Sequence, residues 1–489
     1  IFAVFVKQGF AQTDVKYSVA ETPWEDSFGN HRAVLKVEKS KEAVRLNFNW
    51  RRHDNSPNTK RLLIINAKTK DTIQNILRVE VNNEKCELVF GPVEKGVYHF
   101  YYLPFKPDHE WGYYRYGYLK AEEKPNSDWI SANKLDNPKK VGKLPIANCT
   151  QIQARKEFDS FYPMEVTATS SELSNLIKNV NTDYIAFPED RKHPVKMRDY
   201  IPFKWIKNGV SKQFKGKVKR NEYYAFQIAI FAAKKPLENV QLTFNDLKSS
   251  DGNIISSEAF TCFNTTGVDP YGNAFTKQVD IDKGKVQALW GGTDVTKDIQ
   301  PGEYTSIVVI KVDGQPDQEI EVKLAISNEL IANRGDDEPW RHSRLRWLNS
   351  TIGIDNEPTL PYTSIVSDET TGTLDLYGKQ IKFNENGLPS SLKAWKTQIL
   401  SRSMDFYLKG QLIKDKKLET TTSESGVVQK SYSGVSENFN IQTESTTEFD
   451  GHLNYKIKLA ATSDIKLEDF ILEIPFKSSI AEYMMGMDL

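Results

Sequence analysis

The sequence contains few cysteines, and those present are widely separated. Cys86, Cys149 and Cys262 are odd in number and form no Cys-x-x-Cys pair. This pattern excludes a disulfide scaffold and the common zinc-finger arrangements. We expect the three thiols to be buried as small apolar side chains.

The chain also lacks an excess of charge of either sign. Its 65 lysines and arginines balance 65 aspartates and glutamates. A nucleic-acid binder or a polybasic membrane-surface protein carries a net positive face, so neither a nucleic-acid partner nor a membrane surface is predicted. No apolar run reaches the roughly 18 to 20 residues that a membrane-spanning helix needs, so no transmembrane segment is predicted.

Signatures of common cofactor sites are missing as well. The sequence contains no P-loop, no Gly-x-Gly-x-x-Gly motif and no Gly-x-Ser-x-Gly motif. The spacing Asp280-x-Asp282-x-Gly284 resembles half of a calcium loop but lacks the later bidentate glutamate, and we interpret it as a turn at a strand end. The seven histidines do not cluster. We therefore predict no cofactor and no metal site.

The sequence is rich in the residue types and the alternation that are typical of β-strands. Its 21 tyrosines, 25 phenylalanines and 9 tryptophans favour strands, although aromatic faces also suit sugar rings. Val44–Trp50 and Leu453–Leu459 alternate apolar and polar residues without a break, which is typical of strands with one buried face. Readable helices are few. One should follow Thr169-Ser170-Ser171-Glu172, which matches a capping box.

A chain of this length should hold about three domains. The fold class we predict is mostly β, with three consecutive β-sandwich domains. The run Glu419–Ser436, rich in Ser, Thr and Glu, is expected to be a long hairpin or a mobile loop. The expected organisation is a signal-peptide remnant at 1–12, an N-terminal β-sandwich at 13–160, a second β-sandwich at 161–335, a hinge at 336–362, a third sandwich at 363–480 and the start of a further domain at 481–489.

The first residues bear on localisation. Ile1–Val6 is apolar, and Gly9-Phe10-Ala11 gives the small-x-small pattern of a signal-peptidase site before Gln12. A signal remnant predicts an exported protein that is periplasmic, secreted or on the outer surface. The alternative is a buried N-terminal strand interrupted by Lys7.

The segment Trp340–Tyr362 differs from an ordinary linker because it is rich in large aromatic and cationic residues. One interpretation is a hinge packed between two sandwiches, with Trp347 buried there. The other is a ligand cleft, in which tryptophan stacks on sugar faces and arginine donates to hydroxyls or carboxylates. A helix here would place Trp340, Arg344 and Trp347 on one face as candidate carbohydrate-binding residues, with Trp290 as a weaker candidate.

Glycosidases usually need two carboxyl groups that face each other across the bond to be cut. The adjacent acids Asp337 and Glu338 are the weak candidates for such a pair. They lie between Gly335 and Pro339, a composition typical of a solvated turn. We therefore predict no catalytic residue in this segment.

Several motifs, in order along the chain, resemble a bacterial group related to glycoside hydrolase family 123. The similarity covers about Asp14 to the end of the chain. The segments that carry it are Phe187–Arg191, His193–Met197, Gln287–Trp290, Pro301–Tyr304, Arg344–Tyr362, Gly387–Pro389 and Ala481–Met487.

The resemblance implies that the second sandwich, at 161–335, is like the family 123 N-terminal domain and that the third sandwich is a galactose-mutarotase-like supersandwich. It also implies that a catalytic (β/α) barrel follows, of which Ala481–Met487 would be the entry. The Asp-Glu pair of family 123, in which Asp holds the acetamido group of the substrate and Glu is acid and base, belongs to that barrel. We expect the chain to form the ancillary domains of an exported glycoside hydrolase, with a poly- or oligosaccharide as partner. The alternative is a non-catalytic carbohydrate-binding or cell-surface adhesion protein.

Overall fold

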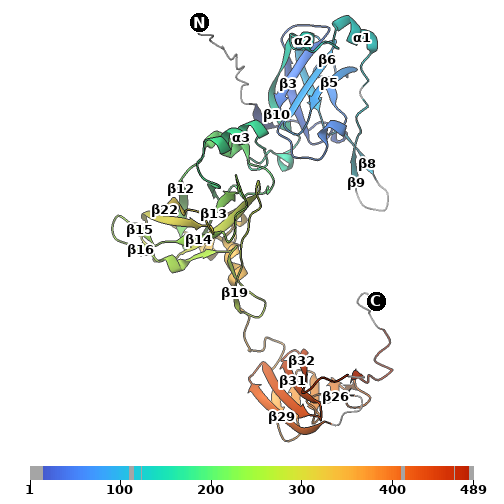
Figure 1. Ribbon diagram of the computed structural model, residues 1–489, viewed down its shortest axis with the longest axis vertical. Coiled ribbons are helices and arrows are strands. Elements are labelled where there is room, and N and C mark those ends of the chain that lie inside the picture. Colours follow the sequence, from blue (N-terminus) through green and yellow to red (C-terminus); the bar gives the residue numbers. More distant parts are fainter. Residues whose placement is uncertain (1–14, 109–114, 123, 409–412, 467–468, 484–489) are drawn as a thin grey trace. The chain divides into compact units, whose positions relative to one another are not determined.

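The computed structural model describes residues 15–108, 115–122, 124–408, 413–466 and 469–483. The chain divides into two compact units, Ile1–Ser350 and Thr351–Leu489. The protein is mostly β, with several separate sheets that pair into sandwiches (Figure 1). The expected signal remnant at 1–12 and most of the expected barrel entry lie outside the described residues.

The N-terminal sandwich is built from strands in the order β4-β7-β2-β10-β3-β6-β5, with β1 beside β10. One end of β10 pairs with β3 and the rest pairs with β2, so this strand joins the two layers. The strands are β1 (Lys16–Val19), β2 (His31–Val37), β3 (Val44–Asn49), β4 (Leu63–Asn66), β5 (Asn75–Val81), β6 (Lys85–Gly91), β7 (Gly96–Tyr101) and β10 (Ile146–Ala154).

The alternation predicted for Val44–Trp50 is confirmed, because Val44, Leu46, Phe48 and Trp50 are all buried in the core between the layers. Short elements border this sandwich. They are the hairpin β8 (Phe105–Asp108) and β9 (Arg115–Tyr118), the helices α1 (Ser127–Asn133) and α2 (Pro138–Val141), and the 3₁₀ turns Asp26–Phe28, Pro57–Thr59 and Glu157–Asp159.

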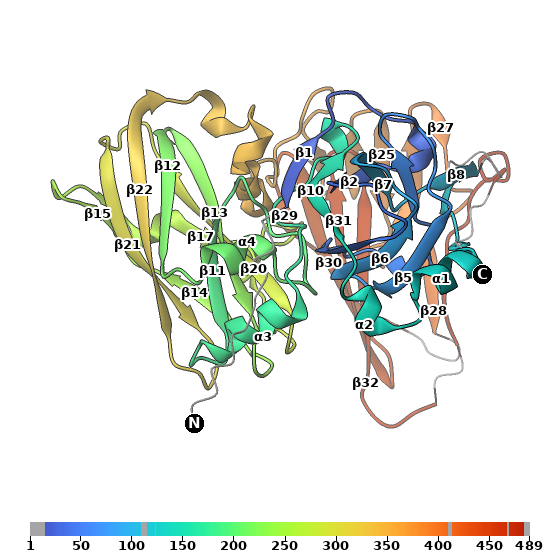
Figure 2. The same ribbon diagram turned by 90° about the horizontal axis from the view of Figure 1, so that it is seen from above.

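The second sandwich packs the sheet β11-β13-β20-β17 against the sheet β12-β22-β21-β15-β16, as Figure 2 shows. Strand β13 is buried along its whole length because helices cover its other face. The strands are β11 (Ile185–Asp190), β12 (Gln213–Arg220), β13 (Glu222–Phe231), β14 (Gln241–Phe244), β15 (Leu247–Ser249), β16 (Ile254–Ile255), β17 (Phe260–Cys262), β18 (Thr266–Val268), β19 (Ala274–Thr276), β20 (Val286–Val295), β21 (Gly302–Lys311) and β22 (Gln318–Leu330).

The capping box predicted at Thr169 and Glu172 is present and begins helix α3 (Ser170–Lys178). Together with α4 (Phe203–Asn208), this helix packs on the outer face of the sheet that contains β13. Four 3₁₀ helices also belong to this part of the chain: Ser257–Ala259, Ala332–Gly335, Pro339–Arg341 and Ser343–Asn349.

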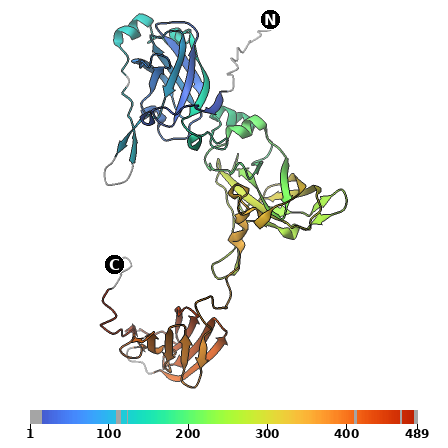
Figure 3. The same ribbon diagram turned by 180° about the vertical axis from the view of Figure 1, so that it is seen from behind.

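The second unit, coloured orange to red in Figure 3, packs a five-stranded sheet against a four-stranded one. The run Glu419–Ser436 forms a hairpin, the first of its two predicted states. The strands are β23 (Val366–Asp368), β24 (Thr373–Leu376), β25 (Lys379–Phe383), β26 (Pro389–Ala394), β27 (Thr397–Gln398), β28 (Asp405–Leu408), β29 (Lys414–Ser423), β30 (Val427–Val435), β31 (Phe439–Glu448), β32 (Leu453–Ala461) and β33 (Phe470–Glu473).

Buried charge fastens the segment 339–349 to the second sandwich. Glu222, at the start of β13, is fully buried, and its Oε1 lies 2.6 Å from Nη1 of Arg191 and 2.9 Å from Nη1 of Arg341. The backbone N–H of Lys219 donates to the other carboxylate oxygen at 2.8 Å. One carboxylate therefore connects three segments that are distant in sequence.

The expectation of a helix with Trp340, Arg344 and Trp347 on one face is wrong. The segment forms two 3₁₀ turns, separated by His342 in the left-handed conformation. Trp347 is 53% exposed, so the expectation that it is buried is wrong too. The buried side chains are Arg341 and Ser343, because charge pairing rather than aromatic packing holds the segment.

Replacing Glu222 by alanine should destabilise the second sandwich by about 3 to 5 kcal/mol, because two buried guanidinium groups would lose their counterion. Urea-induced unfolding of the full chain measures this change. Glu329→Ala is the matched control, since Glu329 pairs with Lys219 at the surface and its loss should leave the unfolding midpoint nearly unchanged. Equal effects of the two substitutions would contradict the assignment.

Candidate functional site

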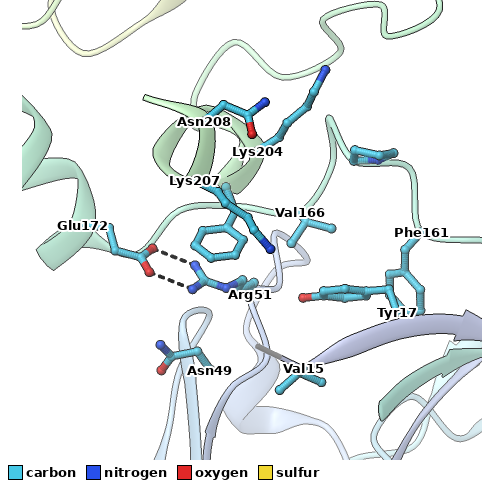
Figure 4. Close-up of a pocket in the computed structure, with 12 residues that line it drawn as sticks. Val15, Tyr17, Asn49, Arg51, Phe161, Val166, Glu172, Lys204, Lys207 and Asn208 are labelled. Atoms are coloured by element: carbon cyan, nitrogen blue, oxygen red, sulfur yellow. Dashed lines mark hydrogen bonds and ion pairs between the residues drawn. The ribbon is translucent and has the colours of Figure 1, made fainter. Parts of the chain in front are cut away.

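A cleft lies inside the first unit, where the N-terminal sandwich meets α3 and α4 (Figure 4). Its main cavity measures about 450 Å³ and an adjoining cavity about 330 Å³. The two cavities share Tyr17, Arg51, Phe161 and Val166, and we call them together the interdomain cleft.

Arg51 connects the two walls of the cleft. It follows β3 in the left-handed conformation, with φ of 53°. Its guanidinium donates to both carboxylate oxygens of Glu172 at 2.7 Å, as the dashed lines in Figure 4 show, and to the carbonyl of Thr167 at 3.1 Å. The same guanidinium lies 3.5 Å from the ring centre of Phe203. Arg51 is therefore occupied in joining the two sandwiches.

Glu172 is ionised in this arrangement. Burial alone would raise the pKa of Glu172, but hydrogen bonds from Arg51 and from the backbone N–H of Thr169 outweigh that effect and hold it below its ordinary value. The same carboxylate completes the capping box of α3. A single side chain thus fixes both the start of the helix and the position of Arg51.

Arg52 faces the adjoining cavity. Its Nε and Nη2 donate to Asp54 at 2.6 Å, and its guanidinium lies 4.4 Å from the ring centre of Trp50 and 4.8 Å from that of Tyr102. The side chain is only 5% exposed, yet Nη1 has no hydrogen-bond partner among the described residues. A buried N–H without an acceptor is costly, so this atom is suited to a ligand oxygen.

Asp54, another of the carboxylates that line the cleft, is also ionised. Burial raises the pKa of Asp54, but the hydrogen bonds from Arg52 and Lys60 more than offset this and lower it overall. Neither Asp54 nor Glu172 can therefore donate a proton at neutral pH. These two carboxylates hold cationic side chains in place instead of acting as acids.

Aromatic rings form the remaining wall. His31 stacks on Phe161 with ring centres 4.3 Å apart, and Tyr17 lies 4.9 Å from the same ring. Burial lowers the pKa of His31, so the imidazole is neutral at pH 7. At the rim, Tyr118 is 47% exposed and Phe158 is 96% exposed. Such faces can stack on the apolar faces of sugar rings.

The residues singled out from the sequence lie elsewhere. Arg344 and Trp347 meet, with the guanidinium 5.2 Å from the indole centre, because residues three apart align on a 3₁₀ turn. Trp290 packs against His342 at 5.1 Å between ring centres. The ring of Trp340 is approached by three cations at 4.3 to 5.3 Å, which occupy its faces. Their role in sugar binding stays a prediction.

The two acidic candidates are in a turn. Asp337 is exposed, while Glu338 accepts a hydrogen bond from Nε of Arg341 at 2.9 Å. That bond lowers the pKa of Glu338, so its carboxylate is ionised at neutral pH.

No group of three or more His, Cys, Asp or Glu residues that could hold a metal occurs in the described part of the chain. Nor does any described helix have the length and apolarity to cross a membrane.

Sequence reasoning missed the residues of the interdomain cleft. A signal was present, since Trp50-Arg51-Arg52-His53-Asp54 places an aromatic residue, three basic residues and an acid directly after a clear strand. Charged residues at a strand end are usually solvated. Only the packing of α3 and Phe161 over this end turns them into cavity walls.

The Arg51–Glu172 pair should make the free energy of unfolding of the first unit depend on pH. Glu172 has a lowered folded pKa, so its contribution is present above its unfolded pKa of about 4.3 and is lost as the pH falls through the folded value. Glu172→Gln should cost about 2 kcal/mol at pH 7 and much less near pH 3, measured by urea unfolding. Glu319→Gln, an exposed residue of β22, is the control. A cost for Glu172→Gln that did not vary with pH would refute this account.

Comparison with known proteins identifies two segments. Residues 22–155 match the glycoside hydrolase 123 N-terminal domain, and residues 366–489 match the glycoside hydrolase 123 third domain. No curated protein matches the chain.

Among solved structures, the chain aligns with a family 123 glycoside hydrolase from Clostridium perfringens, studied for glycolipid glycan hydrolysis. The identity is 16% and the TM-score 0.24, over 30% of this chain and 28% of that one. It also aligns with Spo0M from Bacillus subtilis at 8% identity and a TM-score of 0.18, over 58% and 91% of the two chains. At these TM-scores the structural alignments carry no weight.

The chain thus spans less than a third of the length of the clostridial enzyme. The two family matches together cover 258 of the 489 residues. The chain therefore carries the N-terminal and third domains of glycoside hydrolase family 123.

Proposed function

We propose that these domains are the glycan-binding, non-catalytic part of an exported glycoside hydrolase, whose catalytic barrel lies in another part of the protein. The two domain matches support the enzyme class. The small-x-small pattern at Gly9–Ala11 supports export. The paired sheets of the second unit agree with a galactose-mutarotase-like supersandwich, which we include in the proposal.

The observation that carries glycan binding is the interdomain cleft. It combines aromatic faces at Tyr17, Phe161 and Phe158 with the unsatisfied, buried N–H of Arg52. A sugar presents apolar C–H faces and polar hydroxyl edges, so it needs both kinds of partner. Because both matched domains come from a glycoside hydrolase family, we propose oligosaccharides as ligands.

The rim of the cleft can be tested without harming the fold. Phe158→Ala should weaken binding of a glycolipid-derived oligosaccharide about fivefold, roughly 1 kcal/mol, because one stacking face is lost. Isothermal titration of the full chain measures this. Tyr271→Ala is the matched control, since Tyr271 is 81% exposed on a turn of the second sandwich and does not line the cleft. Unchanged affinity for Phe158→Ala would reject the cleft as the glycan site.

The described chain should hydrolyse nothing by itself. Asp54, Glu172 and Glu338 all have lowered pKa values, so none can protonate a leaving group at neutral pH. Aryl glycosides, including 2-acetamido sugars, should give no turnover above a heat-inactivated control. Turnover that disappeared in the double variant Asp337→Asn/Glu338→Gln would overturn this expectation and make that pair catalytic.

A further inference from the structure

A second cavity, of about 670 Å³, lies on the second sandwich and shares no lining residue with the interdomain cleft. It is bordered by the turn after β11, by strands β12 and β22, and by the 3₁₀ turn Pro339–Arg341. We call it the cationic pocket and define it by Arg191, Lys192, Lys215, Lys217, Lys219, Trp340 and Arg341.

Strand alternation places three lysines on one side of this pocket. In β12, Phe214, Gly216 and Val218 are buried, while Lys215, Lys217 and Lys219 point to the opposite face. Lys219 pairs with Glu329 at 2.7 Å. Lys215 and Lys217 are exposed and form no ion pair with any residue that the structure describes, so their charge is available to a ligand.

The acidic residues of the pocket are already engaged. One carboxylate oxygen of Asp190 accepts the backbone N–H of Lys192 at 2.8 Å, and the other accepts the hydroxyl of Tyr224 at 3.1 Å. Glu329 is paired with Lys219, as described above. The carboxylates therefore offset only part of the positive charge, and the pocket favours an anion.

Besides Nη1 of Arg191, which is ion-paired with Glu222, three polar atoms that line the pocket are buried and have no hydrogen-bond partner among the described residues. They are Nε of Arg191, Nδ1 of His193 and Oγ of Ser327. Native proteins leave few buried polar atoms unsatisfied, because each one loses its hydration without gaining a hydrogen bond. Three at the edge of one pocket point to a ligand that supplies oxygen atoms.

Arg191 is held in position for such a ligand. Its side chain is 2% exposed, and Nη1 lies 2.6 Å from Oε1 of Glu222. The guanidinium is 4.3 Å from the ring centre of Tyr224 and 5.3 Å from that of Trp340. With its faces against these rings and Nη1 against a carboxylate, the guanidinium keeps Nε for donation to a ligand.

We propose that the cationic pocket binds a carboxylate- or sulfate-bearing sugar residue of a glycan. The anionic group would contact Arg191, Lys215 and Lys217, and the sugar hydroxyls would contact His193 and Ser327. The preference for an anion follows from the pocket alone, whereas the sugar part rests on the proposed function. The interdomain cleft and this pocket would then bind different parts of one class of ligand.

The test titrates the full chain at low salt with three probes: glucuronate, glucose and sodium sulfate. Glucuronate should bind at least tenfold more tightly than glucose and more tightly than sulfate, and added salt should weaken its binding. Lys215→Ala/Lys217→Ala should lower the affinity for glucuronate at least tenfold. The matched control Lys248→Ala/Lys311→Ala removes the same charge from the same sheet outside the pocket and should leave the affinity unchanged.

Arg191→Lys keeps the positive charge but removes Nε, so it should also weaken glucuronate binding, and circular dichroism checks that the variant is folded. No binding of glucuronate or sulfate, or equal loss in the two double variants, would overturn the proposal. Sulfate binding as tightly as glucuronate would overturn its sugar part only. Phe158→Ala should not change glucuronate binding, so failure of the cleft and failure of this pocket can be told apart.

Discussion

The buried carboxylate of Glu222 is the constraint on which the second sandwich depends. Two guanidinium groups, from Arg191 after β11 and Arg341 after β22, share one of its oxygens. A buried charge must be paired, so these segments can take only arrangements that bring the three groups together. That requirement fixes the turn after β11, the start of β13 and the segment 339–349, and it builds one wall of the cationic pocket.

The requirement that a buried charge be paired also shapes the interdomain cleft. Arg51 and Arg52 are adjacent in sequence but serve different walls, because Arg51 takes a left-handed conformation that turns the chain. Arg51 joins the N-terminal sandwich to α3 through Glu172, whereas Arg52 lies among Trp50, Tyr102 and Asp54. The guanidinium of Arg51 is engaged by Glu172 and the carbonyl of Thr167. Nη1 of Arg52 has no hydrogen-bond partner among the described residues and can donate to a ligand.

A zero net charge hides this local organisation. The total balance of 65 positive and 65 negative side chains argues against nucleic acid and membrane surfaces as partners of the whole chain. Locally, however, β12 presents three lysines on one face next to two buried arginines. A glycan-binding protein can therefore be neutral overall and still select acidic sugars. The reason is that a ligand in a pocket interacts most strongly with the charged side chains nearest to it, and only weakly with the distant charges that make up the net charge.

The sequence by itself determined the β class, the buried face of Val44–Trp50 and the helix start at Thr169. Each of these depends on neighbours within a few residues, and periodicity and capping record such neighbours directly. The sequence also predicted the family, through motifs in their proper order.

Only the tertiary structure decided what holds 339–349 in place and which residues line the cavities. Trp347, expected inside, is half exposed, while Arg341, which no sequence pattern singled out, is buried. The partner of Arg341 is 119 residues away in sequence, and that of Arg51 is 121 residues away. No local pattern encodes such pairs, because the free energy of burying a charge depends on which distant counterion the fold brings to it.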